Sequence, residues 1–145
     1  MGRRDRGRNV RGIGRGRLTG DARLRRIDLL ALADLPDGTM QMAFADGTDQ
    51  VIVVNSGGTV RAFQGICTHE YFELDKGFLT GGGSPGPDGT PVGTLTCALH
   101  LSRFDLADGE ALDPPAELPL ATYRVVIEDG RVLIEVPEGP LPIND

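Results

Sequence analysis

Short apolar stretches, separated by Gly, Pro, Asp and Ser, dominate the pattern of this chain. These stretches are too short for stable helices, and several are rich in β-branched residues, which favours strands. The Ser56-Gly57-Gly58 sequence is typical of a tight turn between two of them. The pattern predicts an antiparallel meander whose first four strands cover residues 27–31, 39–45, 51–54 and 59–63.

A hairpin near the end of the chain is the clearest local prediction. Residues 122–127 and 131–136 alternate apolar and polar side chains around Glu128-Asp129-Gly130. A period of two indicates strands with one buried face, and an Asp-Gly pair accepts the positive φ angles of a hairpin turn.

The middle of the chain predicts short elements and few helices. We expect strands at residues 95–96 and 103–105, a turn at Asp108-Gly109, and one short helical turn over 70–74. The predicted fold class is therefore all-β and antiparallel, with a β-sandwich or barrel base that carries a small subdomain.

Three segments fall outside this pattern. Residues 80–93 contain many Gly and Pro, so we predict a mobile surface loop without regular structure. Residues 1–26 alternate Arg and Gly with almost nothing apolar to bury, and we predict a disordered tail. The expected domain covers residues 27–136, and residues 137–145 form a C-terminal tail.

Charge is distributed unevenly between the tail and the domain. Residues 1–26 hold ten arginines and two aspartates, a net of +8, whereas residues 27–145 hold five basic and nineteen acidic groups, a net of −14. An acidic domain suits electrostatic steering toward basic partners. The tail has no aromatic residue to stack on bases, so we do not expect nucleic-acid binding.

The composition favours a cytoplasmic protein. Two cysteines do not form a secreted disulfide framework. Arg25-Arg26 could begin an export signal, but the apolar stretch that follows is short and contains Asp28. No stretch approaches the roughly 20 apolar residues of a membrane-spanning helix, so we expect no membrane partner.

All of the cysteines and histidines of the chain fall in one pattern. Cys67-Thr68-His69 is followed, after 27 residues, by Cys97-Ala98-Leu99-His100. Each pair can bring a thiolate and an imidazole to one short turn, and two such turns offer four metal ligands.

Three occupants of such a site are open on residue type alone. The first is a tetrahedral structural zinc ion. The second is a mixed-ligand 2Fe–2S cluster, with thiolates on one iron and imidazoles on the other. The third is no metal, with the cysteines in a disulfide or left as buried thiols.

The residues around the two pairs carry a family resemblance. The pairs, followed by Arg103-Phe104-Asp105-Leu106 and Gly109, resemble a Rieske iron–sulfur protein. The downstream Pro114-Pro115-Ala116, Pro119-Leu120 and Tyr123-Arg124-Val125 are similar to Rieske ferredoxins of aromatic-ring-hydroxylating dioxygenase systems. The resemblance covers most of the chain and places the cluster-binding part at about residues 65–105.

This resemblance implies one Rieske 2Fe–2S cluster per chain. Cys67 and Cys97 would bind the inner iron, and His69 and His100 would bind the outer iron through Nδ1 near the surface. The implied function is one-electron transfer from a flavin-dependent reductase to a terminal oxygenase, with no catalytic residues in the carrier itself. Because two ferric ions, two sulfides and two thiolates sum to zero charge, the potential is higher than with four thiolates.

Two other functions belong to different classes. One is the small Rieske-like subunit of an assimilatory nitrite reductase, which often lacks the cluster ligands that are intact here. The other is an interaction module in which zinc and the same four residues serve structure only.

Departures from the Rieske proteins of respiratory complexes narrow the subtype. Where those proteins carry a disulfide across the cluster loops, this chain has Phe72 and Leu99, whose apolar contact could replace it. Where they carry hydroxyl donors to the cluster sulfur, this chain keeps Ser102 but has Phe104 in place of a tyrosine.

The loss of one donor predicts a low reduction potential. Hydrogen bonds to sulfur stabilise the more negative reduced state, so we expect a potential of about −150 mV, at the low end of the Rieske range. Protein-film voltammetry measures this value directly. A potential well above zero would contradict the assignment of Phe104.

Overall fold

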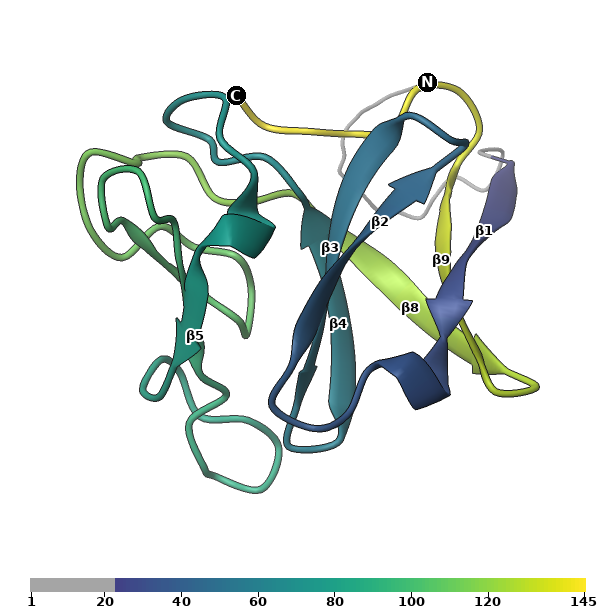
Figure 1. Ribbon diagram of the computed structural model, residues 1–145, viewed down its shortest axis with the longest axis horizontal. Coiled ribbons are helices and arrows are strands. Elements are labelled where there is room, and N and C mark those ends of the chain that lie inside the picture. The colour runs from purple at the N-terminus through teal and green to yellow at the C-terminus, as the bar shows by residue number, and fades with distance from the viewer. Residues whose placement is uncertain (1–22) are drawn as a thin grey trace.

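The structure is a computed structural model that describes residues 23–145, and it is built from two antiparallel sheets (Figure 1). The six-stranded sheet has the order β1-β9-β8-β4-β3-β2, and the three-stranded sheet has the order β5-β6-β7. The larger sheet consists of β1 (Leu24–Ala31), β2 (Met40–Ala45), β3 (Asp49–Ser56), β4 (Thr59–Gln64), β8 (Thr122–Glu128) and β9 (Arg131–Pro137). The smaller sheet consists of β5 (Phe78–Thr80), β6 (Thr94–Thr96) and β7 (Arg103–Asp105). The predicted all-β fold class is confirmed.

Two short 3-10 helices complete the described elements. They are η1 (Leu32–Asp34) and η2 (Leu74–Lys76). The helical turn expected at residues 70–74 therefore begins only where that segment ends. Within the described part of the chain, no helix is long and apolar enough to cross a membrane.

Strand β3 is buried on both faces and separates two hydrophobic cores. Val51 and Val53 pack into the core enclosed by the large sheet. Ile52 and Val54 point the other way, into the core beneath the small sheet. Because successive side chains of a strand alternate between faces, a continuous β-branched run suits a strand that carries a core on each side.

The second core joins the small sheet to the large one. Phe63 of β4 packs there with Leu95 of β6 and Phe104 of β7, and none of these three side chains is more than 2% exposed. Cys67 and Cys97 belong to the same core. The small sheet thus forms the predicted subdomain, and Figure 1 shows β5 beside the curled large sheet.

The hairpin predicted near the end of the chain is confirmed. Strands β8 and β9 are antiparallel, and their pairing runs from Glu128 opposite Arg131 to Arg124 opposite Glu135. Asp129 and Gly130 have φ angles of 51° and 73°, as a tight turn of this kind requires.

The first strand begins earlier than the sequence pattern predicts. Residues 1–22 of the predicted tail lie outside the described residues, but β1 starts at Leu24 and pairs with Pro137 of β9. Arg26 forms ion pairs with Glu128 and Glu135. The sequence pattern groups Arg26 with the arginines of the tail because of its charge. In the structure, two acidic residues of β8 and β9 hold its side chain on the surface of the sheet.

The Gly- and Pro-rich segment over residues 80–93 is held by hydrogen bonds at several points. Its first residue belongs to β5, and the amide of Val92 bonds to the carbonyl of Ser84. The buried carboxylate of Asp105 accepts from the amide (3.0 Å) and the hydroxyl (2.6 Å) of Ser84. Burial alone raises the pKa of Asp105, but these bonds and the amide of Ala107 lower it overall.

The segment predicted as a C-terminal tail packs against the domain. Leu141 is buried in the first core, and the buried hydroxyl of Tyr123 donates to the carbonyl of Pro142 at 2.6 Å. The side-chain amide of Gln64 bonds to both backbone groups of Asn144, at 2.7 and 2.9 Å.

Gly77 provides a test of the packing between η2 and the strand that precedes Cys97. A Cβ atom at Gly77 would lie 1.8 Å from the carbonyl oxygen of Thr96, so a side chain forces the backbone apart. We expect Gly77→Ala to lower the free energy of unfolding by about 1–3 kcal/mol, the usual cost of overpacking.

Chemical denaturation of the two variants Gly77→Ala and Gly81→Ala measures this effect. A Cβ at Gly81 meets nothing within 4 Å, so that control should leave stability nearly unchanged. Equal stability of both variants would show that Gly77 has room for a side chain beside the carbonyl oxygen of Thr96.

Candidate metal centre

Two loops of the same design hold the four predicted ligands. In the first, which follows β4, the amide of Cys67 donates to the carbonyl of Phe72 at 3.0 Å. In the second, between β6 and β7, the amide of Cys97 donates to the carbonyl of Ser102 at 2.9 Å. Each cysteine therefore lies at the base of its loop, and each histidine lies beyond it toward the tip.

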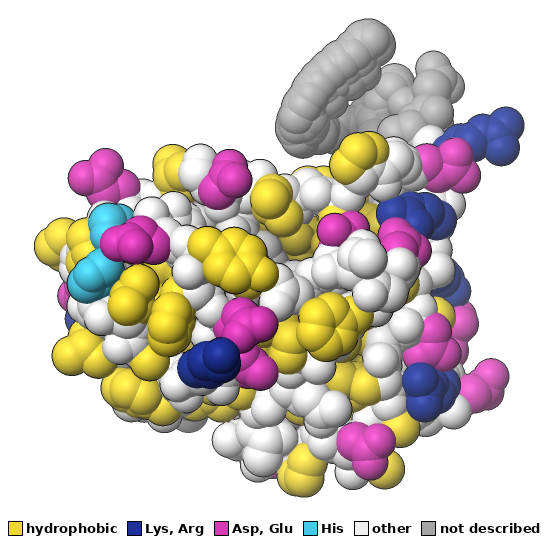
Figure 2. All heavy atoms as spheres, turned by 45° about the horizontal axis from the view of Figure 1, so that its top comes forward, with side chains coloured by type: hydrophobic (Ala, Val, Ile, Leu, Met, Phe, Trp, Pro, Cys, Tyr) yellow, Lys and Arg dark blue, Asp and Glu magenta, His cyan; other side chains and the backbone are white. Residues whose placement is uncertain are grey.

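Burial separates the two kinds of ligand. Cys67 and Cys97 are only 4% and 2% exposed, whereas the side chains of His69 and His100 are 30% and 42% exposed. The imidazole ring centroids lie 4.9 Å apart. Figure 2 shows both histidines together at one end of the molecule, beside hydrophobic side chains. The donors thus present sulfur on the inside and nitrogen on the outside.

This arrangement fits a mixed-ligand cluster. Both cysteines are free, so no disulfide uses the thiols. Burial raises the pKa of the Cys97 thiol, with a smaller contribution from Cys67. A bound cluster would take Cys67 and Cys97 as thiolates, and its positive iron would offset the charge that burial disfavours.

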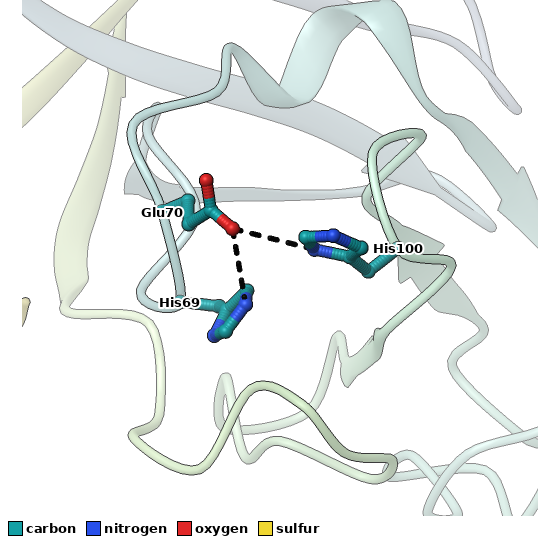
Figure 3. Close-up of side chains that lie close together, drawn as sticks. All are labelled: His69, Glu70 and His100. Atoms are coloured by element: carbon teal, nitrogen blue, oxygen red, sulfur yellow. Dashed lines mark ion pairs between the residues drawn. The ribbon is translucent and has the colours of Figure 1, made fainter.

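A carboxylate lies between the two imidazoles (Figure 3). Oε1 of Glu70 is 3.3 Å from Nε2 of His69 and 3.8 Å from Nδ1 of His100. The nitrogen of His69 that contacts Glu70 is Nε2, so this contact does not use Nδ1, and ligation through Nδ1 stays a prediction. For His100 the nitrogen nearer to Glu70 is Nδ1, and a half-turn of the ring about its Cβ–Cγ bond would point that atom away.

A proline-containing loop after β7 joins the two ligand loops. The hydroxyl of Thr68 donates to the carbonyl of Leu118 at 2.8 Å. The amide of Ala116 donates to the hydroxyl oxygen of Ser102 at 3.2 Å. The side chains of Thr68 and Ser102 are buried, so this loop ties the two ligand loops together near their bases.

The predicted supporting residues have different environments. Ser102 is 1% exposed, and its oxygen accepts from Ala116, which leaves its proton available to another acceptor. Phe72 packs against the second core, whereas Leu99 is 40% exposed at the other loop. A direct contact between Phe72 and Leu99 therefore stays a prediction.

Sequence patterns alone did not identify several contacts in and beside the ligand loops. The sequence pattern places Glu70 only in a helical turn, although its position next to His69 is a usable signal. The anchor at Thr68 depends on Leu118, fifty positions away. The contact of Gln64 with Asn144 spans eighty positions, and no local pattern indicates either pairing.

Comparison with known proteins gives one consistent result. The sequence model of the Rieske [2Fe-2S] domain matches residues 26–124. The chain is 34% identical to the ferredoxin component of an alkene monooxygenase system from Xanthobacter autotrophicus, over 80% of this chain and 84% of that protein. It is 31% identical to the ferredoxin subunit of a 3-phenylpropionate/cinnamic acid dioxygenase from Shigella flexneri, over 80% of this chain and 98% of that one.

A solved structure agrees with these relatives. The ferredoxin of Sphingomonas yanoikuyae B1 superimposes with a TM-score of 0.64 and 31% identity. The match covers 78% of this chain and 100% of that chain.

Ser102→Ala tests the link between the second ligand loop and the proline-containing loop. The variant leaves the buried amide of Ala116 without its acceptor, so we expect the free energy of unfolding to fall by about 1–3 kcal/mol. Thermal unfolding measures the loss. Thr48→Ala, which removes an exposed hydroxyl, is the control, and an equal effect in both variants would show that the Ser102 contact contributes nothing specific.

Proposed function

Because this chain belongs to the Rieske [2Fe-2S] domain family, we propose that it carries single electrons from a flavin-dependent reductase to a terminal oxygenase. The observation that supports this most strongly is the pair of buried thiols beneath two exposed imidazoles. The relatives are named as ferredoxin components of oxygenase systems, so the chain is an electron-transfer component and not itself the catalyst.

The ligand assignment follows from the position of each donor. We assign Cys67 and Cys97 to the inner iron, and His69 and His100 to the outer iron. When bound, the cluster accepts and releases one electron at a time. The protein contributes an apolar environment around the sulfur ligands and keeps the imidazoles at the surface, where a second protein can approach them.

Exposed apolar side chains near the histidines support docking of a partner at this end. Tyr71 is 77% exposed, Leu101 is 61% exposed and Leu118 is 44% exposed. All three belong to the two ligand loops and the proline-containing loop that joins them. A patch of this kind, next to a redox centre, suits a small and transient interface.

Charge outside this patch supports encounters with basic surfaces. Residues 27–145 carry a net charge of −14. Two copies of the carrier therefore repel each other, whereas a partner with a positively charged surface is attracted. The relatives serve two different oxygenase chemistries by name, so the property they share is delivery of electrons. Buried free thiols suit the reducing cytoplasm, where we place the protein.

Replacement of an outer ligand tests the assignment. We expect His100→Ala to lose the brown-red colour and the characteristic paramagnetic signal of the reduced wild-type protein, because one iron loses a donor. His100→Cys should retain iron with an altered spectrum, since a thiolate can replace the imidazole.

Visible absorption and electron paramagnetic resonance of freshly purified protein give the readout. Leu112→Ala, which truncates another exposed side chain, is the control and should keep the native spectrum. An unchanged spectrum in His100→Ala would contradict the ligand assignment, and a colourless wild-type protein that contains zinc would contradict the proposed function.

A further inference from the structure

Glu70 is the acidic side chain that approaches both predicted outer ligands. Its Oε1 lies 3.3 Å from His69 and 3.8 Å from His100, as Figure 3 shows. Within residues 23–145, this is the one group of three or more Cys, His, Asp or Glu side chains whose ligand atoms all lie within 4.8 Å of one another.

No cation of the described domain neutralises the charge of Glu70. The lysine and arginine ion pairs in this part of the chain all involve other acids. Their acidic partners are Asp28, Asp46, Glu73, Asp113, Glu128 and Glu135. The carboxylate of Glu70 is 54% exposed and lies beside the two imidazoles.

We propose that Glu70 is a positioning residue that lowers the reduction potential of this carrier. This inference rests on the proposed function, since it concerns the electron held at the same site. The site gains one negative charge when it takes up an electron, and a carboxylate beside the outer ligands opposes that gain. The contact with Nε2 of His69 acts in the same direction, because an acceptor at the far ring nitrogen makes the imidazole a stronger donor to the oxidised metal.

The size of the effect follows from the exposure of the carboxylate. The outer iron would lie across the imidazole from Glu70, and two unit charges about 7 Å apart, in a dielectric between about 50 and 80, change an equilibrium roughly three- to fivefold. For transfer of one electron, a tenfold change corresponds to about 59 mV. Because Glu70 is exposed to solvent, dissolved salt should screen much of this interaction.

Glu70→Gln is the direct test, since it removes the charge and keeps the size of the side chain. Spectroelectrochemical titration should show that the variant is reduced about three- to fivefold more readily than wild type at about 10 mM ionic strength. The difference should narrow at about 1 M salt, where the screening length falls to about 3 Å. With a purely structural role of Glu70, the difference in potential between variant and wild type would not depend on salt.

Two further variants separate charge from position. Glu138 follows β9 of the large sheet, where its amide donates to the carbonyl of Arg23. Glu138→Gln removes one negative charge there, as Glu70→Gln does at the ligand loop, and the potential of this variant should stay near that of wild type. Glu70→Asp keeps a negative charge at the loop tip and should stay closer to wild type than Glu70→Gln. Equal shifts in Glu70→Gln and Glu138→Gln, or no shift in either, would overturn the inference.

Cluster content distinguishes the possible failures. If Glu70→Gln keeps a native Rieske spectrum but an unchanged potential, this inference fails and the proposed function stands. If neither Glu70→Gln nor Glu70→Ala retains the cluster, Glu70 serves folding of the loop and the inference is wrong. A wild-type protein without the Rieske spectrum would contradict the proposed function itself.

Discussion

The packing of the small sheet against the outer face of β3 and β4 is the interaction on which the rest of the structure depends. One face of β3 closes the core of the large sheet, and its other face carries Ile52 and Val54 beneath the small sheet. Cys67 and Cys97 lie within that second core. The same apolar contacts that hold the two sheets together therefore also exclude water from the thiols.

This packing imposes an asymmetry on the candidate metal centre. Each loop is closed by an amide–carbonyl hydrogen bond at its base, so the cysteine is buried while the histidine reaches the surface. Thiolates inside and imidazoles outside suit a carrier, because the apolar interior protects the sulfur ligands and the exposed rings bring the electron close to a partner. Glu70 adds a negative charge on the exposed side, beside both imidazoles.

Local signals in the sequence predicted much of this arrangement. The Asp129-Gly130 turn and the β-branched run of β3 follow from residue type and period, and the fold class follows from the spacing of such runs. What the pattern missed depends on distant contacts. The start of β1 is set by cross-strand partners more than a hundred positions away, and Ser84 in the Gly- and Pro-rich segment is anchored by Asp105. Contacts of this kind leave no local periodicity, so a single sequence does not reveal them.

The cluster site would hold two chemically different irons between the two ligand loops, one bound by the two cysteines and the other by the two histidines. Mössbauer spectroscopy of the oxidised protein, enriched with the isotope iron-57, tests this arrangement most directly. We predict two quadrupole doublets of equal area, one from a sulfur-bound iron and one from an iron that also binds nitrogen. A single doublet from two equivalent irons, or protein that binds no iron when prepared without oxygen, would contradict the account.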